Sequence, residues 1–224
     1  MKKLFTIFNF VFLALIVAGD ICYTIFGGLW LKSLTSLMFV MLGGINLFYA
    51  IKNKTKYLKF SIWLFVGLVL AMAGDIVLNL YFIGGAILFA IGHVFFFVSY
   101  CFVQEFKWTD LIYTAIIFVP SLMVLLFVPI LNYGGILMQI VCIAYALIIS
   151  LMLGKAIANF VREKNMFTLI ILVGCALFFF SDLMLLFDVF AGAKVAGILC
   201  LATYYPAEFL LAHSTFTGTN KGKK

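Results

Sequence analysis

The sequence AMAGDIVL at residues 71–78 places an ionisable carboxylate inside an apolar segment that is long enough to cross a lipid bilayer. A carboxylate at membrane depth costs free energy, and such acids face the interior of a helix bundle, where they bind or react. The pattern of a small residue, an aspartate and a leucine three positions later returns at Ser181 and Asp182, and part of it occurs at Gly19 and Asp20. We therefore expect a membrane protein with an acidic interior.

The composition supports a membrane protein. Of the 224 residues, 67% are apolar and 10% are charged, which lies far outside the average of soluble proteins. A helix needs roughly 20 apolar residues to cross the bilayer core. The windows that satisfy this requirement are 4–25, 30–51, 58–79, 83–103, 110–129, 133–153, 166–187 and 192–213. We predict an all-α, polytopic membrane helix bundle of about eight transmembrane helices, with residues 1–224 in a single domain.

The distribution of lysine and arginine orients the predicted bundle. Of the 15 lysines and arginines, only Lys32 and Lys194 fall on one side, and the rest, including the C-terminal Lys223 and Lys224, fall on the other. Positive charge collects in cytoplasmic loops, so both termini are predicted to be cytoplasmic in a multi-pass protein of the cell membrane. The net charge of +7 is then a topology signal and a contact with anionic membrane lipids. We expect no nucleic-acid partner.

Polar side chains within the windows share a depth. Asp20, Asp75 and Asp182 lie about 24–26 Å along their helices from the cytoplasmic side, at the helical rise per residue, so they could converge on one cavity. Asp188 is expected to lie beyond the membrane edge, in solvent. Lys32 begins the second window at the same outer level, where it either pairs with an acid or extends to the interface. A stripe follows Lys32 at helical spacing: Ser36, Gly43 and Asn46.

For three further polar residues the sequence does not decide which group each one contacts. His93, in the middle of the fourth window, could bond to a backbone carbonyl or pair with Asp75. Tyr204 and Glu208 share a helix face, but Glu208 counts as deeper than the aspartates unless Pro206 unwinds the helix. Two histidines at opposite depths do not supply a catalytic zinc site. We expect neither metal nor cofactor, with an all-carboxylate Mg²⁺ or Ca²⁺ site as the alternative.

Together these motifs resemble the YhhN family of lysoplasmalogenases. The matching positions are Lys32 with Leu34, Gly74 with Asp75 and Leu78, Gly92 with His93, Ser181 with Asp182 and Leu185, and Tyr204 with Ala207 and Glu208. The sequence departs from the family pattern at Ser33, where the family has proline, and at Glu208, where it has glutamine. The resemblance covers nearly the whole chain. It implies hydrolysis of the vinyl ether bond of lysoplasmalogens to a fatty aldehyde and glycerophosphoethanolamine or glycerophosphocholine.

The implied reaction suits a pair of carboxyl groups. A vinyl ether is cleaved by protonation of an alkene carbon and addition of water to the resulting cation, which calls for one acid and one carboxylate. The resemblance makes Asp75 and Asp182 this pair, in an order that stays open, with His93 and Tyr204 orienting them. The lysophospholipid substrate is expected to meet Lys32 through its phosphate and to place its chain among phenylalanine-rich helix faces. Further substrate-binding residues are expected at Asp20, Asn46 and Glu208.

Two other functions use the same residues. A proton-coupled membrane transporter of a small or lipid-like solute would also need buried acids, a histidine and a repeated motif on two helices. A non-catalytic lipid-binding or assembly protein would use the acids to pair with Lys32 and with hydroxyl groups. Substrate flux, lipid products and assembly defects distinguish the three functions. Hydrolysis is the favoured interpretation.

Overall fold

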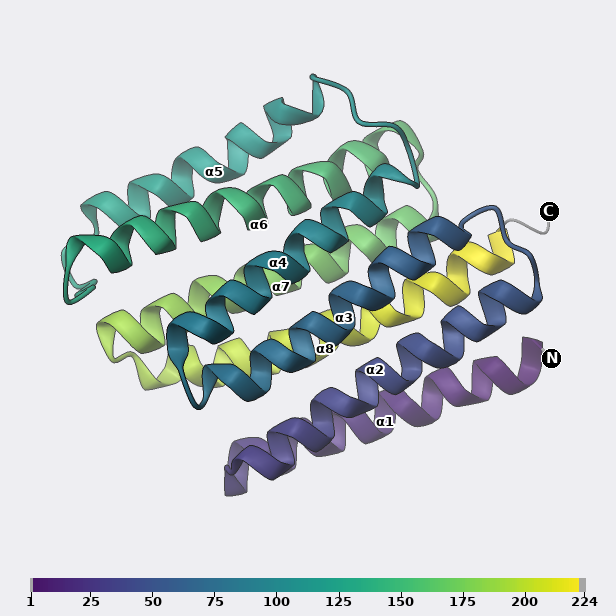
Figure 1. The fold of residues 1–224 in the computed structure, drawn as a ribbon, viewed down its shortest axis with the longest axis horizontal. Helices are drawn as coiled ribbons and strands as arrows, with labels where there is room; N and C mark the ends of the chain where they lie inside the picture. The colour runs from purple at the N-terminus through teal and green to yellow at the C-terminus, as the bar shows by residue number, and fades with distance from the viewer. Residues whose placement is uncertain (1, 222–224) are drawn as a thin grey trace.

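The computed structural model describes residues 2–221, and this part of the chain forms eight helices and no strand (Figure 1). All eight are long and apolar enough to cross a membrane, which confirms the predicted all-α bundle. Lys223 and Lys224, which the sequence assigns to the cytoplasmic side, lie outside the described residues. The helices are α1 (Lys2–Phe26), α2 (Leu29–Lys52), α3 (Leu58–Leu78), α4 (Phe82–Cys101), α5 (Asp110–Phe127), α6 (Ile136–Arg162), α7 (Met166–Ala191) and α8 (Lys194–Lys221).

Two helices extend well beyond the apolar windows that predicted them. The predicted spans 133–153 and 192–213 correspond to α6 and α8, which continue to Arg162 and Lys221. The additional turns carry polar side chains, which a hydropathy window rejects. These side chains are buried against neighbouring helices; for example, Asn159 donates a hydrogen bond from Nδ2 to the Tyr100 carbonyl at 2.9 Å. Contacts with neighbouring helices therefore stabilise these turns as helix, although a prediction from hydropathy alone ends the spans before them.

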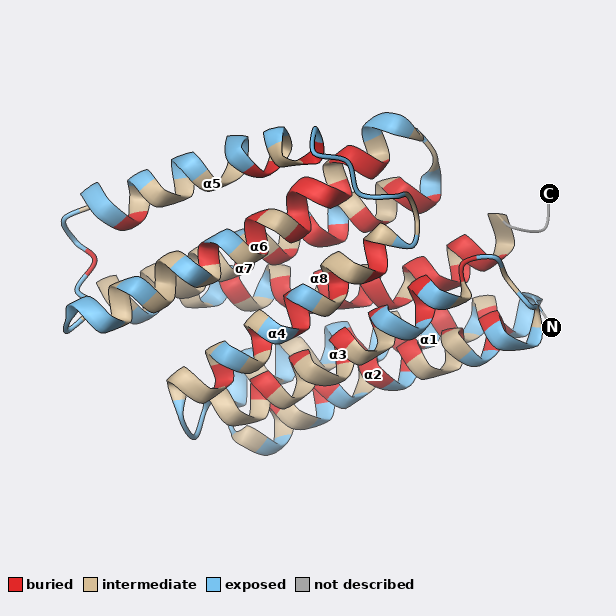
Figure 2. Cartoon of the chain, turned by 45° about the horizontal axis from the view of Figure 1, so that its top comes forward, coloured by how far each residue is buried: buried red, intermediate tan, exposed pale blue. Residues whose placement is uncertain are grey.

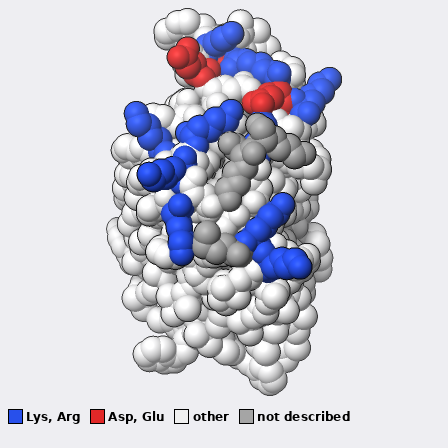
Figure 3. Space-filling view, turned by 90° about the vertical axis from the view of Figure 1, so that its right-hand side faces the viewer, with Lys and Arg blue, Asp and Glu red and all other residues white. Residues whose placement is uncertain are grey.

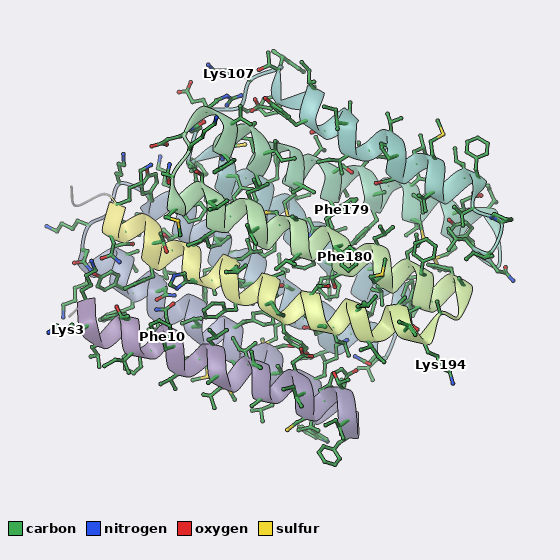
Figure 4. The ribbon with its side chains drawn as sticks, turned by 180° about the vertical axis from the view of Figure 1, so that it is seen from behind. Lys3, Phe10, Lys107, Phe179, Phe180 and Lys194 are labelled. Atoms are coloured by element: carbon green, nitrogen blue, oxygen red, sulfur yellow. The ribbon has the colours of Figure 1, made fainter. Side chains whose placement is uncertain are left out.

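The helix α8 lies inside the bundle. It contacts α7, α2, α1 and α3, and half of its most apolar stretch is buried (Figure 2). α1 and α5 lie at opposite edges in Figure 1 and present mostly exposed side chains outward, as Phe10 does in Figure 4. The most extensive helix contacts join α7 to α8 and α3 to α4. The helices that carry the aspartate motifs therefore each have a close partner.

The two ends of the bundle differ in charge. The start of α1 and the end of α8 lie at one end of the bundle, called here the terminal end, and Lys and Arg side chains gather on its surface (Figures 1 and 3). Lys194 lies at the opposite, distal end (Figure 4). Trp108, in the loop between α4 and α5, and Trp30, at the start of α2, are 82% and 90% exposed, as expected for aromatic side chains at the two membrane interfaces. That the terminal end is cytoplasmic stays a prediction of the charge distribution.

A buried ion cluster fixes the start of α5 to α6. Asp110, the first residue of α5, is 1% exposed and pairs with Arg162 and with Lys155, whose Nζ lies 3.0 Å from Asp110 Oδ2. Lys155 also donates to the Glu105 carbonyl at 3.0 Å, and the Lys107 backbone N–H donates to Asp110. Each charge has a partner, as burial of an ionised group requires.

Removing one member of this cluster should destabilise the fold. In Asp110→Ala the Lys155 ammonium stays buried without a carboxylate, so we expect the free energy of unfolding to fall by about 3–5 kcal/mol. Chemical unfolding in detergent micelles measures this change.

The matched control is Glu163→Ala. Glu163 is half-exposed after the end of α6, and the hydrogen bond from Lys221 lowers the pKa of its carboxyl. An exposed pair contributes only about 0–1 kcal/mol. Equal effects of the two variants would contradict the structural role of Asp110.

Candidate active site

A cavity of about 470 Å³ opens at the distal end of the bundle and contains both aspartates of the repeated motif. Side chains from α1, α2, α3, α4, α7 and α8 line it. Asp75, Asp182, Lys32 and Tyr204 are among the lining residues. The structure therefore brings together four of the residues that the sequence proposes for one site.

Asp75 is held by side chains from two other helices. It lies on α3 and is 2% exposed. On α2, Ser36 Oγ lies 2.6 Å from Asp75 Oδ2, and Lys32 Nζ lies 3.5 Å from Oδ1. On α8, the Tyr204 hydroxyl donates to Oδ2 at 2.7 Å. Lys32 is itself buried, so the ammonium and the carboxylate provide each other's counter-charge.

Asp182 is held by a second set of partners, on α4 and α6. The Tyr145 hydroxyl on α6 donates to Asp182 Oδ2 at 2.6 Å, and His93 Nε2 on α4 lies 3.1 Å from the same oxygen. The Tyr145 hydroxyl and His93 Nε2 are 3.2 Å apart, so the three groups form a triangle. Of the two partners that the sequence allows for His93, a backbone carbonyl or Asp75, the structure shows neither: His93 pairs with Asp182.

Aromatic rings separate the two carboxylate clusters. The Phe178 ring contacts the His93 ring at 4.7 Å between centroids and the Tyr204 ring at 5.3 Å. Phe89 contacts Tyr204 at 6.0 Å and also lines the cavity. We call Phe89 and Phe178 the aromatic floor. Through Phe178 the floor contacts one residue of each cluster, His93 beside Asp182 and Tyr204 beside Asp75.

Glu208 and Asp20 do not line the cavity. Glu208 is fully buried one turn beyond Tyr204, and neither of its carboxyl oxygens has a hydrogen-bond partner within residues 2–221. The helix α8 stays continuous through Pro206, so no unwinding brings Glu208 up to the level of the aspartates. Asp20 lies half-buried on α1, and its Oδ1 also has no partner in the described chain.

Asn46 belongs to a different cluster, away from the cavity. It exchanges two hydrogen bonds of 3.0 Å with Asn9 on α1 and donates a third to the Ala212 carbonyl on α8. His213 Nδ1 lies 2.8 Å from Asn9 Oδ1. The stripe from Lys32 to Asn46 therefore makes two sets of contacts. At its distal part, Lys32 and Ser36 contact Asp75. At its other end, the hydrogen bonds of Asn46 connect α2 to α1 and α8.

Sequence reasoning missed two parts of the site. Tyr145 shares the apolar stretch of α6 with Gln139 and Ser150, and its hydroxyl at membrane depth was a usable signal for a functional side chain. Asp188 was expected in solvent, but α7 continues to Ala191 and Asp188 lines the cavity together with Lys194.

A smaller apolar pocket of about 100 Å³ adjoins the cavity. It lies among α4, α5, α6 and α7, and Asp182, Phe82 and Phe89 line both spaces. Phe179, which lies midway along α7 in Figure 4, lines the apolar pocket. Tyr145 lines it as well. The Asp182 cluster therefore stands at the junction between a polar cavity and an apolar pocket.

A model described as the YhhN family matches residues 29–215, a segment that contains both carboxylate clusters and their partners. No curated protein and no solved structure matches the chain.

The contact between Lys32 and Asp75 predicts coupled effects on stability. Lys32→Met alone leaves the Asp75 carboxylate without its counter-charge, and Asp75→Asn alone leaves the ammonium. We expect the double variant to be more stable than the sum of the single effects predicts, by about 0.5–3 kcal/mol. Unfolding measurements on the four proteins give this coupling energy. Lys194→Met in place of Lys32→Met is the control and should add to Asp75→Asn without coupling.

Proposed function

The chain belongs to the YhhN family, and we propose that it is a lysoplasmalogenase-like hydrolase that acts within the membrane. The substrate would be a lysoplasmalogen, and the products a fatty aldehyde and glycerophosphoethanolamine or glycerophosphocholine. The observation that carries the proposal is the convergence of Asp75 and Asp182 on one cavity, each with its own set of hydrogen-bond partners. Two carboxyl groups in different surroundings can take the roles of acid and base.

The surroundings of the aspartates suggest which takes each role. Asp75 faces the Lys32 ammonium, so we assign it as the carboxylate that stabilises the cation and directs water. Asp182 is bound by a phenol and an imidazole, and we assign it as the acid that delivers the proton. Tyr145 and His93 orient Asp182, and Tyr204 orients Asp75. These three are positioning residues in the proposed reaction.

The reaction balances with these two groups and water. Asp182 gives its proton to the alkene carbon next to the ether carbon; the C=C double bond becomes single, and an oxocarbenium ion forms. Water adds to the ether carbon and gives a proton to Asp75. The hemiacetal then breaks its bond to the glycerol oxygen, which takes the hemiacetal proton, and the aldehyde leaves. A proton returns from Asp75 to Asp182 through water in the cavity.

The two adjoining spaces fit an amphipathic substrate. A lysolipid would place its phosphate in the polar cavity, where Lys32 supplies positive charge, and its alkenyl chain in the apolar pocket beside Phe179. The ether bond, which joins head group and chain, would then lie at the junction, next to Asp182. A soluble solute of uniform polarity would use only one of the two spaces. This arrangement supports a lipid substrate.

A proton-coupled transporter is the second candidate. Glu208 supports it, because a fully buried carboxyl group without a hydrogen-bond partner in the described chain is typical of a proton-carrying residue. A transporter would show solute flux in sealed vesicles, which the aspartate variants abolish, and would form no lipid product. The hydrolase accounts in addition for the apolar pocket beside Asp182.

Neutral replacement of either aspartate should abolish hydrolysis. We expect Asp75→Asn and Asp182→Asn each to lower the turnover of lysoplasmenylethanolamine by about 10²–10⁴-fold, because each variant loses one proton-transfer group. Mass spectrometry of the aldehyde and of the glycerophosphoethanolamine, with purified protein in micelles, measures turnover. Glu163→Gln, at the terminal end, is the control and should keep wild-type turnover. Near wild-type rates in both aspartate variants would exclude the mechanism.

A further inference from the structure

The mouth of the cavity carries one carboxylate and one ammonium that the proposed reaction does not use. Asp188, near the end of α7, and Lys194, the first residue of α8, line the same cavity as Asp75 and Asp182. Neither side chain forms a hydrogen bond or an ion pair with another residue in the described range 2–221. An unpaired anion and an unpaired cation therefore face one opening.

The turn between α7 and α8 fixes both charges at this end. Gly192 adopts the left-handed conformation (φ 65°) that ends a helix, and its N–H donates to the Asp188 carbonyl at 3.1 Å. The Ala193 N–H donates to the Phe187 carbonyl at 3.2 Å, and α8 begins at Lys194. The last turn of α7 is thus closed by backbone bonds, and the Asp188 side chain is free to face the cavity.

Gly197 on α8 makes room for the Asp188 carboxylate. A Cβ atom at residue 197 would lie 2.8 Å from Asp188 Oδ2 and 2.9 Å from its carboxyl carbon. Such a distance is too short, so any larger residue at 197 would displace the carboxylate. Gly197 lines the cavity as well. The position of Asp188 therefore depends on a second residue that can be changed without removing the charge.

The charges follow an order from the interior of the cavity to its mouth. Asp182 lies deep in the cavity, and Asp188 lies about 9 Å further along α7 at the helical rise per residue. Lys32 lies beside Asp75. Lys194, at the distal end in Figure 4, is a second cation that lines the cavity. A head group that enters with its ether at the aspartates would meet the Lys32 ammonium first, and both the Asp188 carboxylate and the Lys194 ammonium at its far end.

We propose that Asp188, with Lys194, forms a head-group site that selects zwitterionic lysolipids whose phosphate carries an ammonium group. Asp188 binds the ammonium, and the two lysines attract the phosphate. A head group that ends in phosphate alone would bring a second negative charge to Asp188 and bind more weakly. The assignment rests on the proposed lysolipid hydrolase, but it concerns binding and can be measured without turnover.

Saturated ether analogues, which lack the reactive double bond, test the site. The probes are 1-O-alkyl-glycerophosphoethanolamine, 1-O-alkyl-glycerophosphate and uncharged 1-O-alkylglycerol, titrated into the full-length protein in lipid nanodiscs by calorimetry. We expect the wild type to prefer the ethanolamine probe over the phosphate probe. We divide the Kd of the phosphate probe by the Kd of the ethanolamine probe. In Asp188→Asn this ratio should fall about tenfold, as for loss of a charged hydrogen bond. Binding of the alkylglycerol should stay unchanged.

Two further variants keep the test independent of folding defects. Gly197→Ala retains the Asp188 charge but displaces it, so the ratio should fall in the same direction. Glu163→Gln removes a carboxylate at the terminal end and should leave the ratio at its wild-type value. Equal binding of the two charged probes by the wild type, or an unchanged ratio in Asp188→Asn, overturns the head-group site. If the wild type prefers the ethanolamine probe and Asp188→Asn loses this preference, but the protein hydrolyses no vinyl ether, the head-group site stands and the proposed reaction alone is overturned.

Discussion

The cost of burying the Asp75 carboxylate at membrane depth constrains the whole distal half of the structure. Lipid tails cannot satisfy this charge, and Lys32 and Ser36 on α2 and Tyr204 on α8 provide its protein partners. These contacts bring α2, α3 and α8 together at one depth. Any rotation of α8 would remove Tyr204 from the carboxylate, so the position of the central helix and the shape of the cavity depend on one acid.

The second carboxylate repeats this arrangement with different chemistry. Asp182 has a phenol and an imidazole as partners where Asp75 has an ammonium and hydroxyls, and the aromatic floor lies between the two clusters. The difference in partners is what allows two like residues to take unlike roles. The adjoining apolar pocket would place the alkyl chain of the proposed substrate beside the Asp182 cluster.

Sequence reasoning predicted the part of the structure that depends on composition and depth. The eight spans and the convergence of Asp75, Asp182 and Lys32 followed from apolar windows and from the helical rise. It did not predict the partner of His93 or the role of Tyr145, because both depend on which helix faces rotate toward each other. The ends of α6 and α8 were missed because buried polar residues, satisfied by neighbouring helices, look like loop residues in a hydropathy window.

Hydrolysis in water enriched in ¹⁸O tests the central claim most directly, because the proposed mechanism adds water to the ether carbon and leaves the glycerol oxygen in place. The aldehyde, trapped at once by reduction to the alcohol, should carry ¹⁸O, and the glycerophosphoethanolamine should carry none, when both are measured by mass spectrometry. That result is expected if protonation of the alkene, the role assigned to Asp182, creates the oxocarbenium carbon that water attacks. Incorporation of ¹⁸O into the glycerophosphoethanolamine, or no aldehyde at all, would contradict the account.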